Sequence, residues 1–308
     1  MFRRVLTIST NAYREAVRAR VLHGIVALAL ATCAYAMVVA SLTLQQPRVL
    51  ANVGSASLSL YAVLTAVVLG ATSLHRELEL KTIFPILSRP LHRHEYVLGK
   101  YCGTLLTLAV FIAIDASALF LILVGYAKSI PLAIGTLAGS LVALGVLLIV
   151  MKRQRIYALV PWSLALVLVS YWLAAPAGEN RQLVASFSIL AFAEVSIVTA
   201  VAVFFSSFSS PFLTSIFTLG IFAIGRSADT LGNLPPKVFG STLHTGGVVV
   251  AKIVPNLYLY VPARPLLLDQ VSGTPVATYV ANAALHSLCY TVILLIFSAA
   301  FFAHRDFQ

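Results

Sequence analysis

The stretch YCGTLLTLAVFIAIDASALFLILVG, residues 101–125, contains a single charged side chain, Asp115. A helix needs about 20 predominantly apolar residues to cross the roughly 30 Å of hydrocarbon in a bilayer. The stretch meets this length, and it lacks the strict alternation of a barrel strand. Because lipid offers the backbone no hydrogen-bond partner, a helix is the form expected here. Residues 101–125 therefore predict a membrane-spanning helix.

Similar apolar runs lie on both sides of this one. Of the 308 residues, 60% are hydrophobic and 10% are charged, whereas about a quarter of the residues in a soluble domain are charged. The sequence thus predicts an all-α, polytopic membrane protein, a single domain of residues 1–308 with about eight spans. Six spans, with part of 131–174 re-entrant, are the alternative. The other seven runs are 22–44, 55–74, 131–151, 156–174, 183–206, 209–226 and 277–303.

The net charge of +11 comes from Lys and Arg residues that cluster in short segments between the apolar runs. With the N-terminus inside, the cytoplasmic segments hold twice as many of these residues as the outer ones, which predicts that both termini are cytoplasmic. The shortest run ends at Arg226, whose side chain can snorkel to the membrane boundary. Separate short basic segments favour membrane lipid as the partner and argue against nucleic acid.

Three segments lie outside the predicted spans. Residues 1–20 carry arginines among apolar positions, which is typical of a helix in the cytoplasmic interface. Residues 227–276 form the outer segment, in which the apolar stretch 247–260 is expected to be interfacial or re-entrant instead of a ninth span. Residues 75–100 form the main cytoplasmic loop.

This loop reads HRELELKTIFPILSRPLHRHEYVLGK. The spacing of Leu80, Ile83, Phe84 and Leu87 places them on one face of a helix, which Pro90 then ends. A second short segment, 92–99, is expected to lead into the span at 101. A short amphipathic helix at a membrane exit can pack into a groove on a cytosolic partner. A solvated connector explains the same composition.

The order of several motifs in the chain resembles that of ABC type-2 permeases. In the loop these are ELELKT (77–82), ILSRP (86–90), PLHR (90–93) and GK (99–100). Outside the loop, AVRAR (16–20) resembles the family's interfacial elbow helix, and FFSSFSSP (204–211) resembles its polar turn between two late spans. VPNL (254–257) resembles the outer segment before the family's last span, and Arg305 with Asp306 resembles its ending. Typical members have six spans, so residues 131–174 would be an additional pair.

The resemblance implies a six-helix core plus this pair, with an elbow helix and a cytoplasmic coupling helix. It also implies a non-catalytic permease subunit of an exporter in a bacterial inner membrane. Its partners would be a second permease chain, the same or related, and two copies of a cytosolic ATPase, which would bind ATP and Mg. The chain itself has no Walker A motif, since Tyr101 follows Gly99-Lys100 and His94 replaces the first glycine. The residues implied to contact the ATPase are Glu77, Glu79, Thr82, Ile83, Phe84, Ile86, Leu87 and Arg93.

Two carboxylates, Asp115 and Glu194, fall inside predicted spans. A charge at the bilayer centre costs about 2.5–3.5 kcal/mol on insertion scales, so each is expected to face protein or water. Both are candidates for a substrate path, with a structural carboxyl as the other interpretation, and His286 could pair with either. The loop histidines lack the Cys or carboxylate neighbours that would close a metal site, so no metal is predicted.

Two other functions remain compatible with the sequence. A permease-like chain can transduce energy to an extracytoplasmic process such as maturation or motility. A secondary transporter or intramembrane enzyme would need no ATPase, but it is expected to show paired intramembrane ionisable groups or inverted repeats. Loop residues His94-Glu95 begin a zinc-protease pattern that Leu98 breaks.

Overall fold

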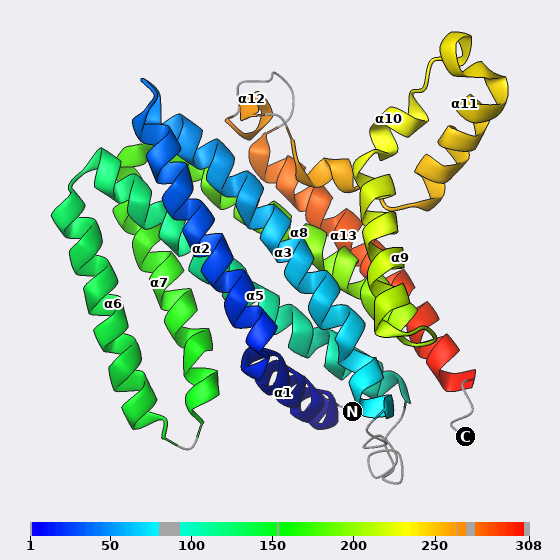
Figure 1. The fold of residues 1–308 in the computed structure, drawn as a ribbon, viewed down its shortest axis with the longest axis horizontal. Coiled ribbons are helices and arrows are strands. Elements are labelled where there is room, and N and C mark those ends of the chain that lie inside the picture. The colour runs from blue at the N-terminus through cyan, green and yellow to red at the C-terminus, as the bar shows by residue number, and fades with distance from the viewer. Residues whose placement is uncertain (1, 80–92, 153, 263, 269–274, 305–308) are drawn as a thin grey trace.

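The computed structural model describes residues 2–79, 93–152, 154–262, 264–268 and 275–304, and within these ranges it contains helices and no strand (Figure 1). The α-helices are α1 (Phe2–Arg18), α2 (Arg20–Ser41), α3 (Gln46–Glu79), α5 (Arg93–Ala127), α6 (Ile130–Val150), α7 (Leu159–Leu173), α8 (Glu179–Ser206), α9 (Pro211–Arg226), α10 (Ala228–Gly232), α11 (Pro236–Ile253), α12 (Arg264–Leu267) and α13 (Val276–His304). Short 3-10 helices are η1 (Arg155–Ala158), η2 (Ala175–Ala177) and η3 (Leu257–Tyr260).

Seven helices of the described chain are long and apolar enough to cross a membrane. They are α2, α3, α5, α6, α7 together with η1, α8 and α13. The prediction of an all-α, multi-pass membrane protein is therefore confirmed. The run 209–226 forms the shorter α9, of 16 residues. The predicted non-spanning stretch 247–260 falls on α11 and η3, neither of which is among the seven.

The centre of the bundle is α8. Residues 193–203 of this helix are all buried, as expected for a predominantly apolar helix that is surrounded by other helices. Small side chains let α3 approach α8 closely. At Gly70 the approach is so close that an added Cβ would lie 2.5 Å from the Cβ of Ala202. The core also includes residues of α2, α5 and α13.

Helix α6 is the opposite case, since none of its residues is buried. Ile149 and Val150, at its end, are 66% and 74% exposed. An apolar surface of this extent suits lipid and not water. Figure 1 shows α6 and α7 as a hairpin at one edge of the bundle, and both helices contact α5. The run 131–174 thus consists of two long apolar helices, of which α7 packs on the core and α6 has no buried residue.

The two ends of the bundle differ. At one end α1 lies across the bases of the long helices, near the end of α3, the start of α5 and the turn between α6 and α7 (Figure 1). The opposite end carries α10, α11 and α12. Helix α1 corresponds to the helix predicted for 1–20, and Ala19, with φ −66° and ψ 124°, separates it from α2.

The third span begins earlier than predicted. Residues 92–99 were expected to form a separate short segment, but α5 is continuous from Arg93 to Ala127. The first turns of α5 are buried at Glu95, Tyr96 and Val97, where α1 packs against them. Tertiary packing thus extends the helix beyond the apolar run that marked it in the sequence.

Candidate functional site

An ion pair between Glu194 and Arg226 joins three helices inside the bundle. Glu194 lies in α8 with a fully buried side chain, and Arg226 is the last residue of α9. Arg226 donates from Nε to Oε1 at 2.7 Å and from Nη2 to Oε2 at 2.9 Å. The Ser59 hydroxyl of α3 donates to Oε2 at 2.9 Å and accepts from Arg226 Nη2 at 3.0 Å. Both carboxylate oxygens are therefore satisfied.

This geometry compensates for the burial of Glu194. Taking an ion out of water costs several kcal/mol, which attraction repays only where the partner is well placed and hydrogen-bonded. The planar guanidinium of Arg226 provides two parallel donors to one carboxylate, the arrangement that suits such a pair. His286, considered as a partner from the sequence, lies elsewhere: its Nδ1 is 2.9 Å from the hydroxyl of Tyr260.

The inward position of Arg226 differs from the sequence expectation of a snorkelling side chain. Only 25% of the side chain is exposed. The end of α9 packs closely against the segment that precedes η3. A Cβ added to Gly225 would lie only 2.8 Å from the carbonyl oxygen of Pro255. The Phe222 ring, 5.4 Å from the Arg226 guanidinium, adds a cation–π contact. These contacts hold the arginine toward Glu194.

Arg226 and Ser59 also line a cleft of about 760 Å³ between α3, α8, α9 and η3, here named the intramembrane cleft. The Ser55 hydroxyl in its wall is buried and has no hydrogen-bond partner in the described part of the chain. Glu194 does not line the cleft, so the pair presents its cationic member there. The remaining lining residues are Asn52, Ala56, Leu60, Phe187, Phe222, Tyr258 and Val261.

The intramembrane cleft combines a polar corner with apolar walls. Arg226 and Ser55 offer donors, whereas Leu60, Phe187 and Phe222 offer apolar surface. Small-molecule sites are typically concave, mostly apolar and equipped with a few placed polar groups. The cleft can therefore hold an amphiphile with its hydrogen-bond-accepting group near Arg226.

Asp115, the second predicted substrate-path residue, occupies a different place. It lies in α5 with 2% exposure, and its Oδ1 accepts a hydrogen bond from the Cys33 thiol of α2 at 3.2 Å. Its Oδ2 has no hydrogen-bond partner among the described residues. Asp115 does not line the intramembrane cleft. The structure thus places the two predicted carboxylates in separate environments.

The predicted ATPase-contact residues fall at the edge of what the structure describes. Thr82, Ile83, Phe84, Ile86 and Leu87 lie outside the described residues. Glu77, Glu79 and Arg93 belong to the ends of α3 and α5, but their side chains are not described. These eight assignments therefore stay predictions.

Adjacent to this segment, α1 packs tightly on the base of α5. A Cβ added to Gly103 would lie 2.5 Å from the carbonyl oxygen of Ser9, and one at Gly99 would lie 2.6 Å from the Ile8 Cβ. Lys100 Nζ lies 3.2 Å from Glu15 Oε2, with the lysine side chain only 3% exposed. Glycine allows this approach because it has no side chain. Helices α1 and α5 are therefore packed so closely at this end that we expect them to move together.

Sequence reasoning identified Glu194 but missed its partners. Ser59 carries no signal in an apolar run, and Arg226 at a helix end reads as a boundary residue. Lys100 counted as a topology determinant, whereas its buried side chain forms an ion pair with the partly exposed Glu15. Neither a scan against protein-family models nor a search of curated proteins gives a match for this chain.

Proposed function

We propose that this chain is the permease subunit of an ABC transporter of type-2 kind. In this proposal a separate cytosolic ATPase hydrolyses ATP, and the permease couples the hydrolysis to export. The active unit contains a second permease chain and two ATPase copies, in a bacterial inner membrane with both termini cytoplasmic. Helix α9 is the eighth span, and α1 is the interfacial elbow.

The observation that carries the proposal is the continuity of α5 from its base to the far end of the bundle. The helix has 35 residues, which corresponds to about 50 Å. It begins at Arg93, directly after the loop that resembles the family's coupling segment. Force applied to that loop would therefore act on the base of a single rigid helix.

The packing of α5 gives this force a route into the core. At its base α5 is fixed to α1 through the Gly99 and Gly103 contacts and the Lys100–Glu15 pair. Farther along, Leu108, Ala116 and Leu119 are buried in the core with residues of α3 and α8. Because packed helices move as units, a push on α5 would move the helices that border the intramembrane cleft.

The cleft supports a substrate-path role for Arg226, which lines it, while the buried Glu194 acts on the path only by holding Arg226 in position. We propose that it receives an amphiphilic substrate. Ala56→Trp would fill the cleft without removing a member of the ion pair, and Val53→Trp places the same ring on the same helix outside the lining. Ala56→Trp should abolish substrate-stimulated ATP hydrolysis, whereas Val53→Trp should leave it unchanged. Equal activity of the two variants would remove the cleft from the path.

The experiment that tests the permease function is purification of the tagged chain with its ATPase. Phe84→Asp and Glu79→Arg should reduce the amount of co-purifying ATPase while leaving membrane insertion intact. Glu179→Arg, an exposed charge reversal at the start of α8, is the matched control and should change nothing. Wild-type association in both loop variants would exclude the proposed coupling segment.

A second candidate, an ATPase-independent secondary transporter, is favoured by one observation. The Glu194–Arg226 pair is a paired set of ionisable groups within the proposed spans, which is one of the two features expected of such a transporter. Proteoliposomes that contain this chain alone separate the two functions. Uptake driven by an ion gradient without ATPase and ATP would support the second candidate and contradict the first.

A further inference from the structure

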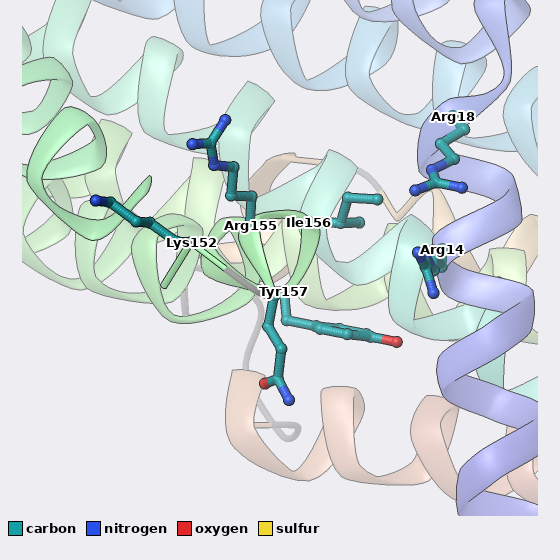
Figure 2. Close-up of a pocket in the computed structure, with 7 residues that line it drawn as sticks. Arg14, Arg18, Lys152, Arg155, Ile156 and Tyr157 are labelled. Atoms are coloured by element: carbon teal, nitrogen blue, oxygen red, sulfur yellow. The ribbon is translucent and has the colours of Figure 1, made fainter. Parts of the chain in front are cut away.

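A cavity of about 580 Å³ lies between α1 and the turn that joins α6 to α7, here named the basic pocket. Figure 2 shows Arg14 and Arg18 projecting from α1 toward this turn, and the ring of Tyr157 extending toward α1. No carboxylate is among the described residues that line the cavity. Its lining residues are Arg14, Arg18, Lys152, Gln154, Arg155, Ile156 and Tyr157.

Two tyrosines fix the walls of the basic pocket relative to each other. The rings of Tyr13 and Tyr157 stack with their centroids 6.0 Å apart. Tyr157 donates a hydrogen bond to the Thr10 carbonyl, and Tyr13 donates one to the Ile156 carbonyl, both at 3.3 Å. Burial, with a smaller contribution from Tyr157, raises the pKa of Tyr13 to about 12, so its hydroxyl remains a donor at neutral pH. The pocket is therefore preformed, which lowers the entropic cost of binding.

Within the described residues, no carboxylate neutralises the positive charge of the basic pocket. In the ranges that the structure describes, no ion pair involves its four cations. Other basic groups at the same end are paired, Arg4 with Glu95 at 3.6 Å and Lys100 with Glu15 at 3.2 Å. The pocket thus concentrates unpaired positive charge where a phosphate or another anion can replace water.

The surroundings of the basic pocket indicate the source of that anion. Lys152 lies two residues beyond the end of α6, where Ile149 and Val150 are 66% and 74% exposed. None of the α6 residues is buried, so this apolar face is available to acyl chains. A free phosphate would use only the cations, whereas a phospholipid carries a phosphate and acyl chains in one molecule.

We propose that the basic pocket binds the phosphate group of an anionic phospholipid of the cytosolic leaflet, with its acyl chains along α6 and α7. Arginine suits this role because its guanidinium binds phosphate oxygens through two parallel donors. The lipid bridges α1 and the hairpin of α6 and α7, adding to the contact made by the two tyrosines. The choice of the cytosolic leaflet rests on the proposed orientation, whereas the binding itself does not depend on the identity of any ATPase or exported substrate.

The test measures lipid preference in phosphatidylcholine nanodiscs that contain trace spin-labelled phosphatidylglycerol or spin-labelled phosphatidylcholine. The wild-type protein should immobilise the phosphatidylglycerol probe preferentially. Arg14→Gln/Arg18→Gln should lower this preference at least about fivefold, since it removes the guanidinium donors to the phosphate and a hydrogen bond to a charged group contributes more than that factor. The matched control Arg3→Gln/Arg20→Gln removes the same charge from the same end, outside the pocket lining, and should retain the preference.

A second variant examines the opposite wall and keeps the test valid if the first variant fails to fold. Lys152→Gln/Arg155→Gln should lower the preference to a similar extent without removing either tyrosine. An equal loss in the control variant would show general surface electrostatics and overturn the proposal. Displacement of the lipid probe by millimolar inorganic phosphate would show a soluble-anion site and overturn the lipid assignment. Unchanged lipid preference in both pocket variants would also overturn the proposal. This holds even if these variants lost binding to a cytosolic protein.

Discussion

Replacement of Arg226 by leucine tests whether the arginine neutralises Glu194. The change removes the only cation that hydrogen-bonds this carboxylate in the described part of the chain and leaves the Ser59 hydroxyl in place. Glu194 has no exposed surface, so water cannot readily replace the lost donors. Removing one partner of a buried pair costs about 3–5 kcal/mol, and we expect a loss of stability in this range for Arg226→Leu.

The reverse change should cost less. Glu194→Gln keeps a polar side chain beside Ser59, and Arg226 is 25% exposed along the intramembrane cleft, where its charge can meet water. We expect a loss of about 1–3 kcal/mol, the cost of imperfectly satisfied hydrogen bonds. The double variant Glu194→Leu/Arg226→Leu should be more stable than Arg226→Leu alone, because it leaves no buried charge without a partner.

Equilibrium unfolding of the purified variants in mixed micelles, followed by circular dichroism, provides the free energies. Arg48→Leu is the matched control, since Arg48 is exposed and donates only to Gln45 at 2.8 Å in the described chain. It should change stability by less than about 0.5 kcal/mol, as exposed substitutions usually do. If Arg226→Leu matched this control, or if the double variant were the least stable, the neutralisation of Glu194 by Arg226 would be refuted.

Three further predictions concern α1 and the arrangement of the spans. Gly103→Leu should displace α1, because its Cβ alone would lie 2.5 Å from the Ser9 carbonyl oxygen. The displacement should appear as increased protease cleavage of α1, whereas the control Gly139→Leu, with open space around it, should not increase cleavage. Tyr13→Phe removes one hydrogen bond and should lower the unfolding free energy by about 1 kcal/mol, whereas Tyr13→Ala should cost at least about 3 kcal/mol through the cavity that it leaves. In a cysteine-free background, an impermeant thiol reagent should label Thr230→Cys in intact cells but label Gln154→Cys only after permeabilisation; the opposite result would reverse the proposed orientation.

Much of the fold could be predicted because the bilayer constrains it strongly. Apolar length marks a span, and backbone groups in lipid must pair within the helix. The runs at 131–151 and 156–174 accordingly became α6 and α7. Boundaries were less predictable where protein contacts replace lipid. The first turns of α5 include Glu95 and Lys100, whose charges argue against burial until α1 supplies Arg4 and Glu15 as partners.

The candidate site shows the same division. Sequence alone determined that Glu194 needs compensation, because a carboxylate within an apolar run is costly wherever the helix lies. Only the tertiary structure decided that Arg226 and Ser59 provide it, since these residues come from α9 and α3 and meet through packing at Gly225 and Gly70. Composition and periodicity act along one helix and so determine the spans. Ion pairs and clefts depend on how helices rotate and approach one another, which is fixed by close packing across the whole bundle.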